Sequence, residues 1–200
     1  MHLAATLLFS DSVAVKSVDR LLFGAILTDA ENGANTHYKR VTPDGLKFFD
    51  VDCFYHDYKN EILSDDLYLG YYLHLIQDSV YRFFVYEKYG WDPSVPGSAE
   101  RLHNDYRLTN TYIAAKYGLK RVPPPPEGIE KERIVRAFPF IVKEFFSDME
   151  KDFATYSEGI PFFLTPARAD EYISLAVDVC KREHESLVSG SGPSYIYKWR

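Results

Sequence analysis

The chain has 200 residues, of which 46% are hydrophobic and 26% are charged, a balance that excludes wholesale disorder. Its formal net charge is -6 at pH 7 and no basic stripe is visible, so we expect no nucleic-acid partner, because phosphate binding needs a basic surface. The two cysteines, Cys53 and Cys180, lie far apart, which excludes a disulfide framework or a thiolate zinc site and is typical of a reducing, cytoplasmic compartment.

Hydrophobic residues recur with a helical period along almost the whole chain. In chain order, the pattern predicts helices over residues 3–10, 18–27, 46–62, 67–89, 99–117, 129–153 with a break at Pro139, and 166–188. Residues 29–44 are rich in turn formers and are expected to form a loop. The longest strongly apolar run, residues 21–27, is much shorter than the roughly 20 residues that span a bilayer, so no stable membrane insertion is expected.

The helices on both sides of the proline run at 123–126 are amphipathic and need partners for their apolar faces. We therefore expect a single all-α domain over residues 1–188, a bundle of about six to eight helices. The last residues, 189–200, begin with Ser-Gly-Ser-Gly-Pro and are expected to form a flexible tail.

The helix predicted over residues 67–89 carries a histidine and an aspartate four residues apart. This spacing puts His74 and Asp78 on one face, where their side chains can converge on one point. Imidazole and carboxylate groups together suit zinc, iron or manganese. A hydrogen-bonded pair in a protein core has the same spacing, so the pair alone leaves both interpretations open.

Three further residues favour a metal site. Asp29 follows the C-terminal end of an apolar helix, where the helix dipole disfavours an anion unless a cation lies nearby. His37 lies in the adjacent loop, and His2 precedes an apolar stretch that must be buried. Each has an ordinary explanation as a turn residue, a solvated histidine or a frayed terminus, but four such coincidences together predict a shared site.

The order of these residues resembles the zinc-dependent phospholipase C family, most closely its short cytoplasmic bacterial members. The resemblance covers roughly the first 120 residues, is looser in the final helix, and rests on His2, Gly24-x-x-x-x-Asp29, Thr36-His37 and Leu69-Gly70-Tyr71-x-x-His74-x-x-x-Asp78. It implies an all-α fold of the phospholipase C/P1 nuclease type, in which a metal cluster hydrolyses phosphate esters. It also implies five metal ligands, namely His2, Asp29, His37, His74 and Asp78.

The chain departs from that family at several points. Thr28 stands where a proline often precedes the aspartate, and residues 79–84 supply no further histidine after the H-x-x-x-D pair. The later histidine and glutamate pair of the secreted enzymes is also missing. We therefore expect one or two metal ions, with Zn2+ first among the divalent candidates, rather than three.

Other residues are candidates for completing the site. His103 and Asp105 lie on a neighbouring predicted helix, and their spacing of two lets only one of them point inward as a further ligand. Arg82 follows Asp78 by one turn and could bind a substrate phosphate with its fork of donors, beside Tyr81. A surface ion pair is the alternative interpretation for Arg82.

The sequence therefore predicts a hydrolase that uses metal-activated water on a small phosphodiester or phosphomonoester. Asp29 or Asp78 would bridge metals or accept the proton of the water. The first alternative is an HD-type nucleotide phosphohydrolase, whose adjacent histidine and aspartate signature is met only by His56-Asp57. The second is a non-catalytic helical protein that keeps the scaffold and binds a structural metal or a partner.

Overall fold

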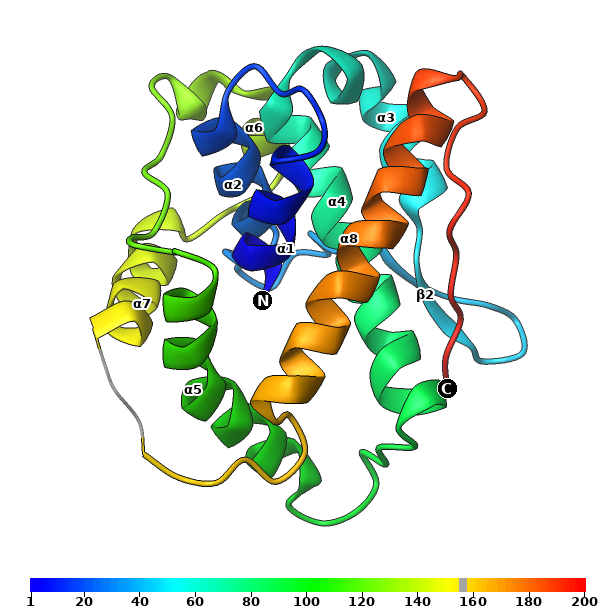
Figure 1. Ribbon diagram of the computed structural model, residues 1–200. Coiled ribbons are helices and arrows are strands. Elements are labelled where there is room, and N and C mark those ends of the chain that lie inside the picture. The colour runs from blue at the N-terminus through cyan, green and yellow to red at the C-terminus, as the bar shows by residue number, and fades with distance from the viewer. Residues whose placement is uncertain (155–157) are drawn as a thin grey trace.

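The computed structural model describes residues 1–154 and 158–200, and the chain is mainly helical, as the sequence predicts (Figure 1). The α-helices are α1 (His2–Ser10), α2 (Val18–Leu27), α3 (Val51–Ser64), α4 (Asp66–Phe83), α5 (Ser98–Lys116), α6 (Arg133–Ala137), α7 (Val142–Ala154) and α8 (Pro166–Val188). Two further short helices are the π-helix η1 (Phe84–Lys88) and the 3-10 helix η2 (Ile129–Lys131). A two-stranded hairpin of β1 (Lys39–Val41) and β2 (Lys47–Phe49) completes the described elements.

Side-chain caps define the ends of the helices that matter most for the site. Asp65 accepts a hydrogen bond from the backbone N–H of Leu67 at 2.9 Å and begins α4. Thr165 accepts one from the N–H of Arg168 at 3.3 Å, with Pro166 as the first helical residue of α8. Both starts agree with the predicted caps. The predicted break at Pro139 is also present, because α6 ends at Ala137 and α7 begins at Val142.

The hairpin corrects the prediction for residues 29–62. The strands pair antiparallel with Lys39 opposite Phe49, so the expected loop contains β1 and the expected start of the third helix is β2. The Asp50 side chain accepts a hydrogen bond from the N–H of Cys53 at 3.0 Å and sets the helix start at Val51. The predicted helix began too early, at residue 46, because the aromatic residues before Asp50 also have a helical spacing.

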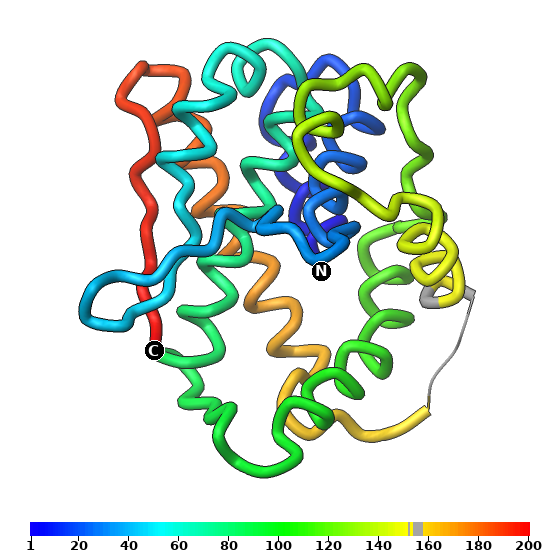
Figure 2. The backbone as a smooth tube through the Cα atoms, turned by 180° about the vertical axis from the view of Figure 1, so that it is seen from behind, coloured from blue at the N-terminus to red at the C-terminus, as the bar shows by residue number. Residues whose placement is uncertain are grey.

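The expected flexible tail is instead held against the body of the molecule. It runs beside the hairpin in both views (Figures 1 and 2). Trp199 forms an antiparallel bridge with Lys47, with N···O distances of 2.6 and 2.9 Å, and only 6% of Trp199 is exposed. The Ser- and Gly-rich residues 189–193 led to the prediction of a flexible tail. The aromatic side chains within residues 195–199 anchor the segment instead.

Helix α4 lies at the centre and contacts α2, α3 and α8. Helix α4 crosses α2 so closely that the two backbones touch, and a glycine on each helix permits this approach. A Cβ at Gly24 would lie 2.0 Å from the carbonyl oxygen of Leu67, and one at Gly70 would lie 2.0 Å from that of Leu21. This close crossing brings the C-terminal end of α2 to the middle of α4.

Helix α8 contacts α1, α4 and α5, so segments from both ends of the chain share packing surfaces. Within the part of the chain that the structure describes, no helix combines the length and the apolar character that a bilayer crossing requires.

Candidate metal centre

The structure brings the five expected ligands together from four segments. His2 begins α1, Asp29 follows the end of α2, His37 lies in the loop before β1, and His74 and Asp78 come from α4. Donor atoms of these residues form two overlapping groups, each within 4.8 Å, and His74 belongs to both.

His74 is fully buried, and its ring is held through one nitrogen. Its Nδ1 lies 2.8 Å from the carbonyl oxygen of Ala25 in α2, so Nδ1 carries the proton and donates it. The lone pair of Nε2 therefore faces Nε2 of His37, 3.3 Å away. A hydrogen bond that fixes the tautomer in this way is the usual support of a metal-binding histidine.

Two carboxylates lie close to these imidazoles. The Asp29 Oδ1 lies 3.6 Å from His74 Nε2 and 3.3 Å from His37 Nε2. The Asp78 Oδ2 lies 3.9 and 3.7 Å from the same two nitrogens. The donor types suit zinc, and these separations are close to the about 3.3 Å between ligands of a tetrahedral zinc ion. The two carboxylates belong to different donor groups, Asp29 with His2 and His74, and Asp78 with His37 and His74.

His2 lies on the other side of His74 and reaches a different oxygen of Asp78. The His2 ring stacks on that of His74 with centroids 4.2 Å apart, and its Nε2 lies 3.5 Å from Asp78 Oδ1. The Gln77 amide donates to Thr6 Oγ1 at 2.9 Å, which leaves its Oε1 to accept from His2 Nδ1 at 2.9 Å. Asp78 thus directs one oxygen at His2 and the other at His37 and His74.

The electrostatic environment favours the metal-binding forms of His2 and Asp29, whereas it favours the protonated form of His37. Burial, reinforced by the neighbouring His74, lowers the pKa of His2 to about 4. Burial opposes ionisation of Asp29, but His74 and the hydrogen bond from His37 hold the pKa of Asp29 well below its usual range. For His37, burial is outweighed by Asp29 and Asp78, which raise its pKa. At neutral pH His2 is therefore neutral and Asp29 is ionised, as metal binding requires.

Two supporting residues have roles that the sequence did not predict. Gln77 orients His2, as described above, and is fully buried beside Asp78. Thr36 donates from Oγ1 to the carbonyl oxygen of Thr28 at 2.9 Å, which ties the His37 loop to the end of α2. Gln77 could have been found in the sequence as an amide side chain on an apolar helix, directly before the candidate ligand Asp78.

His103 and Asp105 do not join the cluster. Asp105 is buried and accepts three hydrogen bonds, at 2.5–2.8 Å, from the backbone N–H groups of residues 162–164. His103 is exposed and lies beside the Tyr106 ring. Only one of the two residues points inward, as their spacing predicts, but Asp105 caps the backbone of residues 162–164 and does not join the candidate ligands.

The substrate-binding candidates lie beyond Asp78 on α4. Arg82 takes part in none of the ion pairs among the described residues, and its Nε is buried without a hydrogen-bond partner there. The Tyr81 hydroxyl accepts a hydrogen bond from the Tyr106 hydroxyl at 2.7 Å. The surface ion pair considered for Arg82 is therefore absent from the described residues.

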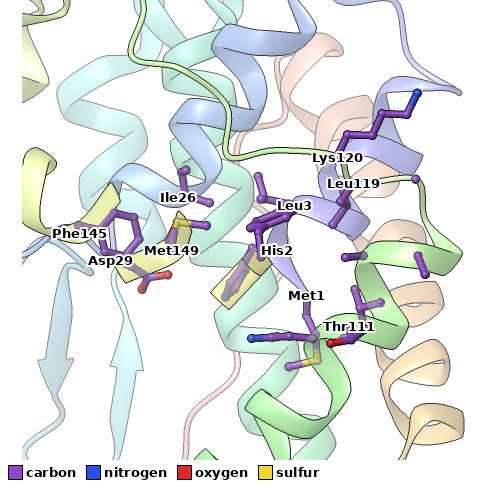
Figure 3. Close-up of a pocket in the computed structure, with 16 residues that line it drawn as sticks. Met1, His2, Leu3, Ile26, Asp29, Thr111, Leu119, Lys120, Phe145 and Met149 are labelled. Carbon is purple, nitrogen blue, oxygen red and sulfur yellow. The ribbon is translucent and has the colours of Figure 1, made fainter. Parts of the chain in front are cut away.

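A cavity of about 630 Å³ lies next to the cluster and is bordered by His2 and Asp29 (Figure 3). Most of its remaining lining is apolar and comes from the start of the chain, α2, α5, α7 and the segment after α5. These apolar residues are Met1, Leu3, Ile26, Ile113, Ala114, Ala115, Leu119, Phe145, Met149 and Phe153. The cluster therefore borders a space that can hold an organic group.

The residue pair of the HD-type alternative lies elsewhere. His56 and Asp57 are on α3, and the His56 side chain is 90% exposed. Among the described residues, neither belongs to a group of side chains with metal-ligand spacing.

Comparison with known proteins adds no relatives, since no family model, curated protein or solved structure matches the chain. The phospholipase C resemblance therefore stays a prediction from the motif order.

Proposed function

We propose that the chain is a metal-dependent phosphoric ester hydrolase, with zinc as the first candidate metal. The observation that carries the proposal is that oxygens of Asp29 and Asp78 lie 3.3–3.9 Å from Nε2 of His37 and of the buried His74, a residue that two donor groups share. Bound zinc supplies Lewis acidity, which lowers the pKa of water to about 7 and neutralises charge on phosphoryl oxygens.

Access to the ligands favours a catalytic site over a structural one. Structural zinc sites are closed by protein ligands, whereas catalytic sites keep a position open. Here the cavity borders His2 and Asp29, and 39% of the Asp29 side chain is exposed. A substrate can therefore approach the ligands from the cavity side.

The carboxylates have separate tasks in this proposal. Asp29 directs Oδ1 at the histidines, and among the described residues no hydrogen bond engages its Oδ2. That oxygen accepts a hydrogen bond from the attacking water and orients it toward phosphorus. Asp78 directs one oxygen at His2 and the other at His37 and His74, so it holds both donor groups in register.

The surroundings support a substrate class. Arg82 and Tyr81 would contact the phosphoryl group, because guanidinium forks and phenols donate to its oxygens. The largely apolar cavity would take the organic part of the ester. The proposed substrate is thus a phosphate ester with an apolar organic group.

Metal analysis and turnover of the purified protein test the proposal. We expect one or two zinc equivalents by mass spectrometry, and hydrolysis of bis(p-nitrophenyl) phosphate or p-nitrophenyl phosphate. His74→Ala should lose both metal and turnover, because it removes the donor that the two groups share. His103→Ala, at an exposed histidine outside the cluster, is the matched control and should keep both.

A His74→Ala protein that keeps its metal and activity would refute the proposal. Stoichiometric metal without turnover on either ester would favour the structural alternative, and activity confined to nucleotides would favour the HD-type alternative.

A further inference from the structure

Arg82 is a half-buried cation for which the described residues supply no anion. It lies one helical turn beyond Asp78 on α4, and its Nε is buried without an acceptor. A buried N–H group of this kind is costly unless a ligand provides an acceptor.

An aromatic ring holds Arg82 in place. The guanidinium carbon lies 5.6 Å from the centre of the Trp199 ring, and Trp199 is almost fully buried. The ring also lies 4.9 Å from Phe49, which in turn is 6.0 Å from the His37 ring. Trp199 thus joins the arginine to the neighbourhood of a metal ligand.

This way of holding an arginine leaves its donors free. A carboxylate partner would occupy the N–H groups of the fork, whereas an aromatic ring contacts the face of the guanidinium plane. The N–H edge then remains available for a bidentate bond to a phosphate. Stacking also restricts the rotamers of a long side chain before the ligand arrives, which lowers the entropy cost of binding.

The C-terminal segment that carries Trp199 is anchored at three places. The fully buried Glu183 of α8 accepts hydrogen bonds from the N–H of Ser194 at 3.0 Å and from the Tyr72 hydroxyl at 2.6 Å. The Tyr197 hydroxyl donates to Glu87 at 3.0 Å. Trp199 itself pairs with β2 through the backbone of Lys47. The position of the ring is therefore set by α8, η1 and the hairpin together.

We propose that Trp199 is a positioning residue, and that the C-terminal segment 194–199 holds Arg82 as the anion-binding group of the site. This inference rests on the proposed function for its ligand, a phosphoryl group. It goes beyond that function because residues 194–199, which lie far from the candidate ligands in the sequence, become a determinant of substrate affinity.

The test uses the zinc-loaded full chain and two readouts. Inorganic phosphate binding is measured by calorimetry, and KM and kcat are measured separately on bis(p-nitrophenyl) phosphate. Trp199→Leu should raise the Kd for phosphate and the KM roughly 3- to 10-fold, with kcat and zinc content within about twofold, because the arginine binds substrate and transition state alike. Trp199→Phe keeps a ring under the guanidinium and should recover most of the affinity. Ile196→Ala, at an exposed neighbour in the same segment, is the control.

A double-mutant cycle separates positioning from general structural support. In an Arg82→Ala background, Trp199→Leu should cause no further loss of phosphate affinity, because its effect passes through Arg82. Additive losses, or unchanged affinity in Trp199→Leu, would overturn the inference. If the zinc-loaded protein binds phosphate but turns over no ester, the hydrolase proposal fails while the phosphate titrations still decide the role of Trp199. Absence of phosphate binding in the unmodified protein would overturn both.

Discussion

His74 shows how a single residue sets the chemistry of the candidate centre. Its Nδ1 donates to the α2 backbone, and its Nε2 is therefore left as a lone-pair donor in a buried space. The sequence placed this residue on an apolar helix face beside Asp78, and the structure adds the partner that orients it. Tautomer control of this kind depends on a carbonyl 49 residues away, so spacing along the helix could not reveal it.

At the residue scale, the pH dependence of the metal-free protein should report on His2. The pKa of its folded state is about 4, below the ordinary value of 6.5, so between these values the unfolded chain binds a proton that the folded chain does not. Stability due to neutral His2 is therefore present above pH 6.5 and is lost as the pH falls toward 4, by on the order of 2–3 kcal/mol.

This prediction is checked by urea unfolding of chelator-treated protein at pH 7 and pH 4.5. His2→Asn should lose less stability between the two pH values than the unmodified chain, since it has no imidazole to protonate. His37, whose pKa is raised, acts in the opposite direction and is present in both proteins. Equal losses in the two proteins would show that His2 is not buried in its neutral form.

At the scale of elements, the crossing of α2 and α4 brings the ligands together. Gly24 and Gly70 let the two backbones touch, and the Ala25 carbonyl then reaches His74. The glycines belong to the motifs on which the phospholipase C resemblance rests, but only the packed structure shows that they permit this close crossing.

Gly70→Ala should destabilise the fold by about 3 kcal/mol and weaken zinc binding, because its Cβ would lie 2.0 Å from the Leu21 carbonyl oxygen and the helices would have to separate. Urea unfolding and a zinc titration with a competing chelator measure the two effects. Asn60→Ala, at an exposed helical position on α3, is the control and should be close to neutral. Unchanged unfolding of Gly70→Ala would contradict the close crossing.

At the scale of the whole molecule, metal binding should couple to folding. The candidate ligands come from four segments, so an ion in either donor group would tie α4 to at least one other segment, and ions in both would join α1, α2, the His37 loop and α4. Free zinc at about 100-fold above its Kd should stabilise the fold by about 2.7 kcal/mol. For a chain of this size, that corresponds to a rise in Tm of about 5–10 °C.

Scanning calorimetry with zinc and with a chelator measures this shift, and His74→Ala should show little of it. The same Tm for the zinc-loaded and chelated proteins would mean that the cluster does not bind the ion in the folded state.

The helical character, the caps at Asp65 and Thr165 and the His74 and Asp78 pair could be predicted from local rules, because helical periodicity, capping and a four-residue spacing act over one or two turns. The full set of five candidate ligands came from the motif order that resembles a known family. The structure confirms the mainly helical fold and brings the five side chains together, and metal binding itself stays a prediction.

The hairpin, the docked C-terminal segment and the separate role of Asp105 emerge only from the packed structure. They depend on contacts between different segments of the chain: Trp199 pairs with Lys47, Ser194 bonds to a buried glutamate of α8, and Asp105 caps the amides of residues 162–164. A carboxylate in a sequence shows its charge and its helix face, but not whether a metal or a row of N–H groups will compensate it. That choice is made by packing, which joins segments the local pattern treats as independent.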